Sequence, residues 1–158
     1  MQARFHRARS ERLNGDRGFT LIEMLVVVVI IGILAGIAIP LYMNYRRGAQ
    51  NKSAESDVRG AISAVEQFYT ENDNVYPVNR NGALGANVLL SLAGNAGNTQ
   101  TVTVSPGNRI YFRNRGTYYV ICGQNTSGGT IYVYNSSSGK PVGTSTQTTL
   151  GTCATNGN

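Results

Sequence analysis

Histidine, cysteine and tryptophan are scarce in this chain of 158 residues, which has one histidine, two cysteines and no tryptophan. A metal site needs about four ligands at close spacing, and the cysteines, Cys122 and Cys153, stand far from each other and from His6. The chain also lacks a GxxxxGK(S/T) phosphate loop, an HExxH helix and an EF-hand loop. We therefore expect no catalytic residues, no cofactor and no metal, and interpret the chain as a protein that is not an enzyme.

Charge is absent from residues 24–43, a run made mostly of Val, Ile, Leu, Gly and Ala. At about 1.5 Å per residue in a helix, this run covers the roughly 30 Å hydrocarbon layer of a membrane. Before it, residues 1–18 hold five arginines and only two acidic residues. Because basic residues that flank a span stay on the cytoplasmic side, we expect the N-terminus in the cytoplasm and the C-terminal part outside.

The junction between the basic segment and the apolar run carries a motif. An ordinary secretory signal has its cleavage site after the apolar core, whereas the small residue Gly18 stands before it. The residues Gly18-Phe19-Thr20-Leu21-Ile22-Glu23, followed by the Val/Ile/Leu run, resemble the prepilin cleavage motif of type IV pilins and their type II secretion relatives. The resemblance covers about residues 13–77 closely and the rest of the chain in general layout.

This resemblance implies a precursor that is processed. A prepilin peptidase would remove the leader, residues 1–18, by cutting between Gly18 and Phe19, and would methylate the new amine of Phe19. Residues 19–45 would then span the inner membrane and, after assembly, form the core of a filament. Residues 46–158 would be a globular head, first in the periplasm and then on the extracellular pilus.

The function that the resemblance implies is structural. The chain would be the major pilin of a type IV pilus, a homopolymer built by the pilus assembly machinery for adhesion, twitching motility and DNA uptake. Two alternatives stay open. One is a minor or competence pilin that binds DNA, and the other is a major pseudopilin of a type II secretion system.

Glu23 stands at the edge of the apolar run, where a deeply placed carboxylate is unfavourable by a few kcal/mol. No Lys or Arg occurs between Phe19 and Tyr45, so we expect no compensating partner within its own segment. The nearest positive charge is the Phe19 amine that cleavage creates. We expect the amine of an incoming subunit to reach Glu23 of an assembled one, which makes Glu23 an assembly residue.

Gly32, Gly36 and Pro40 recur every four residues and so share one face of a helix. Pro40 also deprives that helix of one backbone hydrogen bond. Two interpretations stay open. The three residues are either helix breakers that a membrane helix tolerates, or they form a helix contact of the GxxxG type or a soft spot in the helix. In filaments of the resembled family the segment between the glycine and the proline is commonly unwound.

Beyond the membrane segment, apolar residues take the spacing of an amphipathic helix. They are Val58, Ala61, Ile62, Val65, Phe68 and Tyr69. No strong breaker intervenes, so we predict one helix over residues 19–72, of which residues 46–72 are the amphipathic half. The Asn72-Asp73-Asn74 run and Pro77 end it.

The remaining sequence predicts an α+β fold in which the long helix packs on a four-stranded antiparallel meander, and the resemblance implies that this is the pilin fold. Residues 73–100 form a loop with a helical turn near residues 88–92, and four strand-like runs follow, separated by turn residues. The runs cover residues 101–105, 109–114, 117–122 and 130–134. By alternation we expect Ile110, Phe112, Val120, Ile131 and Val133 to face the helix, and Arg109, Tyr111, Arg113, Tyr132 and Tyr134 to face outward.

The two cysteines predict a disulfide between Cys122 and Cys153, since a metal site is not expected. Closing a loop of about thirty residues stabilises the fold by roughly 3 to 4 kcal/mol in the chain-entropy model. Such a bond persists in an oxidising compartment. The tail, residues 135–158, has little that packs, so we expect this bond to hold it as a loop.

One predicted strand carries a basic pattern. Arg109, Tyr111, Arg113 and Arg115 alternate along it, which would place guanidinium groups and an aromatic ring on one face. That combination suits phosphate contact and base stacking, so DNA contact is one hypothesis. The alternative, which we favour, is a solvated outer face.

Overall fold

The computed structural model describes residues 18–95 and 97–158. The predicted leader up to residue 17, its arginines and His6 lie outside the described residues. Contacts divide the chain into two compact units, with the boundary between Leu41 and Tyr42. Each unit is described by itself below.

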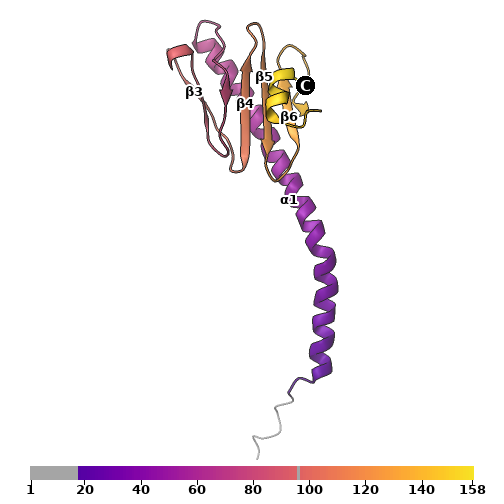
Figure 1. Ribbon diagram of the computed structural model, residues 1–158. Helices are drawn as coiled ribbons and strands as arrows, with labels where there is room; N and C mark the ends of the chain where they lie inside the picture. Colours follow the sequence, from indigo (N-terminus) through magenta and orange to yellow (C-terminus); the bar gives the residue numbers. More distant parts are fainter. Residues whose placement is uncertain (1–17, 96) are drawn as a thin grey trace, which may run out of the picture. The chain divides into compact units, whose positions relative to one another are not determined.

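Helix α1 spans Leu21–Glu71, within two residues of the predicted ends at both termini. Its part in the first unit buries nothing within the chain, and Pro40 lies inside the helix without ending it. In the second unit α1 lies along one face of the sheet (Figure 1) and buries one stripe of residues. The stripe consists of Ala54, Val58, Ala61, Val65 and Phe68. Their spacing of three and four residues confirms the predicted amphipathic half.

A five-stranded antiparallel sheet packs on this stripe, in the order β1-β4-β5-β6-β7. Its strands are β1 (Arg80–Asn81), β4 (Asn108–Asn114), β5 (Tyr119–Asn125), β6 (Ile131–Asn135) and β7 (Gly143–Thr144). A separate two-stranded sheet pairs β2 (Val88–Leu90) with β3 (Gln100–Val102). A short 3-10 helix, η1 (Ala93–Asn95), and a C-terminal helix, α2 (Leu150–Asn156), complete the second unit. The predicted α+β arrangement of a long helix on an antiparallel sheet is confirmed, with five strands in place of four.

The first predicted strand, at residues 101–105, does not join the main sheet. The strand in this region is the shorter β3, because the backbone N–H groups that follow it donate hydrogen bonds to side chains. Val104 N donates to Asn87 Oδ1 at 3.0 Å, and Ser105 N donates to Asp57 Oδ2 at 2.7 Å. The helical turn expected near residues 88–92 is also wrong, because β2 alternates buried and exposed residues and pairs with β3.

The predicted facing is correct for β4 and wrong for β5 and β6. Ile110 and Phe112 do face α1, as expected. Val120, Ile131 and Val133 instead pack on the opposite side of the sheet, against α2. Tyr119, Ile121 and Tyr132 take the places towards α1, with Tyr134 packed beside them. Tyr132 and Tyr134 are therefore not outward residues.

The tail is more ordered than a loop. Val142 and Leu150 are buried, and α2 buries Cys153 and Ala154 completely. Thr149 caps the start of α2 by accepting from Thr152 N, and Gly157 ends it in the left-handed conformation at φ 76°. The sheet is thus covered on both faces, by α1 and by α2.

Gly123 lies where α1 packs closely on the sheet, which gives a test of this packing. A Cβ at this position would meet Val58 Cγ2 and would lie 2.6 Å from Ile110 Cδ1. We expect Gly123→Ala to lower the free energy of unfolding by about 1 to 3 kcal/mol through overpacking. Urea unfolding of the detergent-solubilised protein measures this. Gly143→Ala is the control, because its Cβ would meet only Pro141 O, at 4.0 Å. Equal stability of the two variants would contradict the packing.

Candidate assembly site

The first turn of α1 is closed by a reciprocal pair of side chains. Thr20 N and Thr20 Oγ1 each donate to Glu23 Oε2 at 2.8 Å, and Glu23 N donates to Thr20 Oγ1 at 3.3 Å. This arrangement is a capping box, in which a Thr and a Glu three residues apart satisfy each other's backbone N–H groups. Glu23 thus has a partner in its own segment, and the expectation that it has none was wrong. The Thr-x-x-Glu spacing was the signal that could have revealed it.

The capping box leaves half of the carboxylate available. All three bonds involve Oε2 or the backbone of Glu23, and Oε1 has no hydrogen bond within the described residues. Gly18, Phe19, Thr20 and Glu23 line one recess of about 490 Å³. The Gly18–Phe19 peptide and the carboxylate therefore lie at the same exposed end of the helix. An amine created at Phe19 would find an acceptor nearby, in its own chain or in another copy.

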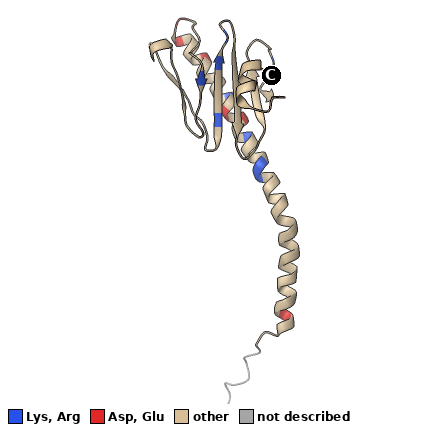
Figure 2. Ribbon diagram, viewed as in Figure 1, with Lys and Arg blue, Asp and Glu red and all other residues tan. Residues whose placement is uncertain are grey.

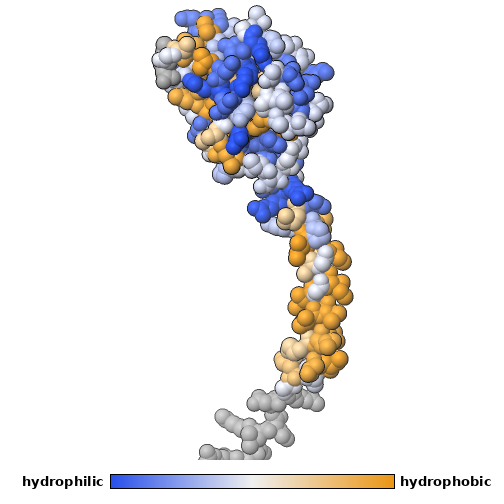
Figure 3. All heavy atoms as spheres, viewed as in Figure 1, coloured by the Kyte–Doolittle hydropathy of each residue, from blue (hydrophilic) through white to orange (hydrophobic). Residues whose placement is uncertain are grey.

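The first unit exposes an apolar surface along its whole length. Large side chains from Leu21 to Leu41 have between 46% and 83% of their area exposed. Figure 3 shows this segment of α1 as almost continuously hydrophobic. The helix is long and apolar enough to cross a membrane, and none of its most apolar stretch is buried inside the protein. Some other apolar partner must cover it, because such a surface is unfavourable in water.

The predicted soft spot lies within this surface. A Cβ at Gly32 or Gly36 would meet nothing within 4 Å in this chain, so any close contact there would come from outside it. The helix continues through Pro40. Local unwinding at these three residues stays a prediction.

The disulfide joins Cys122 of β5 to Cys153 of α2, as predicted. Both residues are fully buried in the cluster beneath α2. Arg115 adds a contact that the sequence did not suggest, because its Nη2 donates to the carbonyl oxygens of Ala154 and Thr155 in the last turn of α2. A cation at a helix C-terminus is favourable, so Arg115 helps to hold α2 in place.

Arg113, another member of the basic strand, is also engaged locally. Arg113 Nη1 donates to the carbonyl oxygens of Arg80 and Phe112, at 3.3 and 3.0 Å, and its guanidinium lies 5.7 Å from the centre of the Tyr111 ring. Arg109 is half-buried, and its Nε is enclosed without a hydrogen-bond partner within the described residues. These contacts favour a structural role for Arg113 and Arg115. DNA contact through this strand stays a prediction.

Comparison with known proteins gives a family motif and several relatives. The family described as "Prokaryotic N-terminal methylation motif" matches residues 13–39. The type IV major pilin protein PilA of Myxococcus xanthus is 41% identical over 66 residues, which are 41% of this chain and 30% of PilA. The type IV major pilin protein PilE1 of Neisseria gonorrhoeae is 40% identical over 92 residues, 58% of this chain and 41% of PilE1.

A third relative is the fimbrial protein EcpC of Eikenella corrodens, 36% identical over 91 residues, which cover 52% of this chain and 59% of EcpC. The chain thus spans less than two thirds of the length of each of these relatives. No solved structure matches it significantly.

Removing the disulfide tests how α2 is held. We expect Cys153→Ser to expose the amides of α2 to exchange, because the burial of Leu150 and Ala154 and the Arg115 contact would then hold it without a covalent bond, and to lower the free energy of unfolding by about 3 kcal/mol. Hydrogen exchange followed by mass spectrometry measures the first effect, with α1 residues 54–68 as the internal reference. Modification of both cysteines by a thiol reagent in the native, unreduced protein would contradict the disulfide.

Proposed function

We propose that this chain, whose methylation motif and relatives support a type IV pilin precursor, is the major structural subunit of a type IV pilus. In this proposal it is a non-enzymatic building block. It is held in the inner membrane by the apolar half of α1, with its head in the periplasm, and then polymerises with other copies into an extracellular filament. Adhesion and twitching motility are the activities that such a filament would serve.

The observation that carries the proposal is the exposed apolar half of α1, none of which is buried within the protein. An apolar helix of this length needs lipid or other protein around it, and a subunit that leaves the membrane must exchange one for the other. Packing the same segment from many copies side by side would provide that second environment. The methylation motif at residues 13–39 supports this interpretation, since it overlaps most of the exposed segment.

Processing at Gly18 would prepare the chain for this exchange. Residues 1–18 carry five arginines, and moving such a segment through the membrane is unfavourable. Cutting after Gly18 removes all of them and leaves a single amine at Phe19. Glu23, one helical turn away, has an unused Oε1 to accept from that amine or from the amine of a neighbouring copy.

Pairing of Glu23 with the Phe19 amine of another copy would make assembly selective for the axial position of each subunit in the filament. An unpaired amine or carboxylate in an apolar filament core would cost several kcal/mol, whereas the pair neutralises both. The capping box would still orient Glu23, since Thr20 holds only Oε2. We therefore propose that Glu23 and the Phe19 amine of another subunit determine where each subunit stops along the filament.

The alternatives differ from this proposal in abundance and location. A minor or competence pilin that binds DNA would be a small fraction of sheared surface fibres, and a major pseudopilin would remain in the periplasm. Two of the relatives are type IV major pilin proteins, which favours the major subunit. Quantifying this chain in sheared surface fibres distinguishes the three.

Processing gives the first test of this proposal. We expect the protein from purified surface filaments to begin at Phe19, with a methylated amine. Intact-mass spectrometry with N-terminal fragmentation measures both features. Protein from cells without the prepilin peptidase is the control and should keep residues 1–18. Filaments whose subunits retain the leader would contradict the proposal.

Replacing Glu23 tests the assembly role. We expect Glu23→Val to insert in the membrane normally, because the segment becomes more apolar, but to reduce surface filaments more than tenfold, because the Phe19 amine would enter the core unpaired. Immunoblots of membrane and sheared-surface fractions measure the ratio, in a strain with no other pilin.

Thr20→Val is the matched control for that experiment, since it removes the capping partner and keeps the carboxylate. We expect Thr20→Val to assemble much better than Glu23→Val. If both variants lost filaments equally, helix capping and not charge pairing would explain the role of Glu23. Normal filaments from Glu23→Val would refute the assembly role.

A further inference from the structure

Immediately after the apolar run, α1 and the β5–β6 turn form a small basic recess. Its lining consists of Met43, Arg46, Arg47, Gln50 and Ser127, and its volume is about 310 Å³. All of these residues belong to the second unit. The turn is fixed against α1, because Thr130 N donates to Asn51 Oδ1 at 3.2 Å and a Cβ at Gly128 would collide with the Asn51 side chain. The recess is thus a fixed feature of the fold.

The polar side chains of the recess can all donate hydrogen bonds. They are two guanidinium groups, one amide and one hydroxyl, and among the described residues no carboxylate lines the recess. Arg46 and Arg47 are exposed and have no hydrogen bond or ion pair within the described part of the chain. Such a set suits an anion with several oxygen atoms, and the planar guanidinium group suits phosphate in particular.

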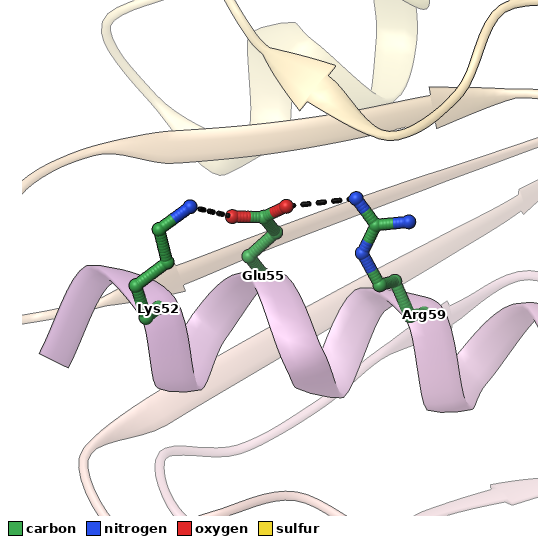
Figure 4. A network of polar contacts seen from close by, with 3 residues as sticks. All are labelled: Lys52, Glu55 and Arg59. Carbon is green, nitrogen blue, oxygen red and sulfur yellow. Dashed lines mark hydrogen bonds and ion pairs between the residues drawn. The ribbon is translucent and has the colours of Figure 1, made fainter. Parts of the chain in front are cut away.

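The nearest carboxylates along α1 do not neutralise these arginines. Glu55 accepts from Lys52 and from Arg59, each at 2.8 Å, as Figure 4 shows. The hydrogen bond from Lys52, followed by that from Arg59, lowers the pKa of Glu55, so this carboxylate stays charged and occupied.

Asp57, the next acidic residue, is occupied as well. Its oxygens accept from Ser105 N, Ser105 Oγ and Asn108 Nδ2 at 2.6 to 2.8 Å. After Asp73 the sequence holds no acidic residue, and Figure 2 accordingly shows acidic residues only on α1 and the turn that follows it. The positive charge of Arg46 and Arg47 is therefore available to an external anion.

The position of the recess along the chain identifies the anion. Met43 is both the last residue of the uncharged run and a wall of the recess, so Arg46 and Arg47 follow the run within one helical turn. Tyr42 and Tyr45, 65% and 72% exposed, flank Met43. Tyrosine and arginine directly beyond a span occupy the headgroup layer of a membrane.

We propose that this recess binds the phosphate of an anionic phospholipid in the outer leaflet of the inner membrane. The inference rests on the membrane insertion in the proposed function, but not on polymerisation. Bound in this way, the headgroup contacts both the helix and the β5–β6 turn of the head. It therefore fixes the depth and rotation of the subunit in the membrane, and the contact is broken when the subunit leaves for the filament.

The test is a lipid titration on the full-length processed protein in neutral detergent, with lipid adducts followed by native mass spectrometry. Phosphatidylglycerol is the anionic probe, and phosphatidylcholine is the zwitterionic comparison. We expect a preference for phosphatidylglycerol that falls roughly fivefold for each of Arg46→Gln and Arg47→Gln, and about 25-fold for the double variant. Arg46→Lys with Arg47→Lys should keep part of the preference.

A charge-matched control separates the recess from general surface charge. Arg59→Gln with Lys140→Gln also removes two exposed cations, and Glu55 keeps Lys52 as its partner. This control should retain the preference for phosphatidylglycerol. An equal loss in the control would show diffuse charge and overturn the proposal, as would an unchanged preference in the double Arg46/Arg47 variant.

Two further outcomes would also overturn it. Displacement of the lipid by inorganic phosphate at similar concentrations would assign the recess to free phosphate. A double variant that keeps its lipid preference but loses filaments would assign the arginines to contact with another subunit. Cell fractionation keeps the two proposals distinguishable, because a chain absent from the membrane would refute the proposed function, whereas failure of the lipid site leaves insertion intact.

Discussion

The apolar half of α1 requires an environment that a single chain does not provide. Up to Leu41 the helix has no buried residue, whereas from Ala54 to Phe68 it buries one residue in every three or four. One continuous helix therefore serves two purposes. Its second part completes the core of a small α+β head, and its first part needs lipid or other copies of the chain around it. The proposed membrane anchor and filament core are the two environments that satisfy this requirement.

The head has a core on each side of its sheet, because both faces are covered. The α1 face holds the larger core, with Phe68, Phe112 and Tyr119 fully buried or nearly so. Tyr119 OH also donates to Glu66 Oε1 at 2.6 Å, which ties the sheet to the helix. Burial, followed by this hydrogen bond, raises the pKa of Tyr119, so it stays a neutral donor. The opposite face is closed by α2, the Cys122–Cys153 disulfide and the Arg115 contact, and the chain needs few apolar residues there.

Much of this arrangement could be predicted from the sequence, and the failures have physical causes. The uncharged run and the spacing of apolar residues after it predicted both halves of α1. A run without charge indicates apolar surroundings on every side of the helix, and apolar residues every three or four positions indicate a helix with one face on a core. Alternation could not orient β5, since five consecutive residues from Tyr119 to Gly123 are all buried between α1 and α2. The α2 helix was missed because it buries only Leu150, Cys153 and Ala154, although Thr149 and Gly157 are typical caps. At the candidate site, the motif predicted Gly18, Phe19 and Glu23, but attention to charge alone missed Thr20 as the partner of Glu23.

The central claim is that the apolar halves of many copies pack together with Glu23 paired to the Phe19 amine of another subunit. A cryo-electron microscopy map of native surface filaments, at a resolution that shows side chains, tests it most directly. The account predicts residues 24–43 in a dry core made only of helices, with the Phe19 nitrogen of one subunit within hydrogen-bond distance of a Glu23 oxygen of another. A filament held together by its heads, with the apolar helices apart from one another or Glu23 facing water, would contradict it.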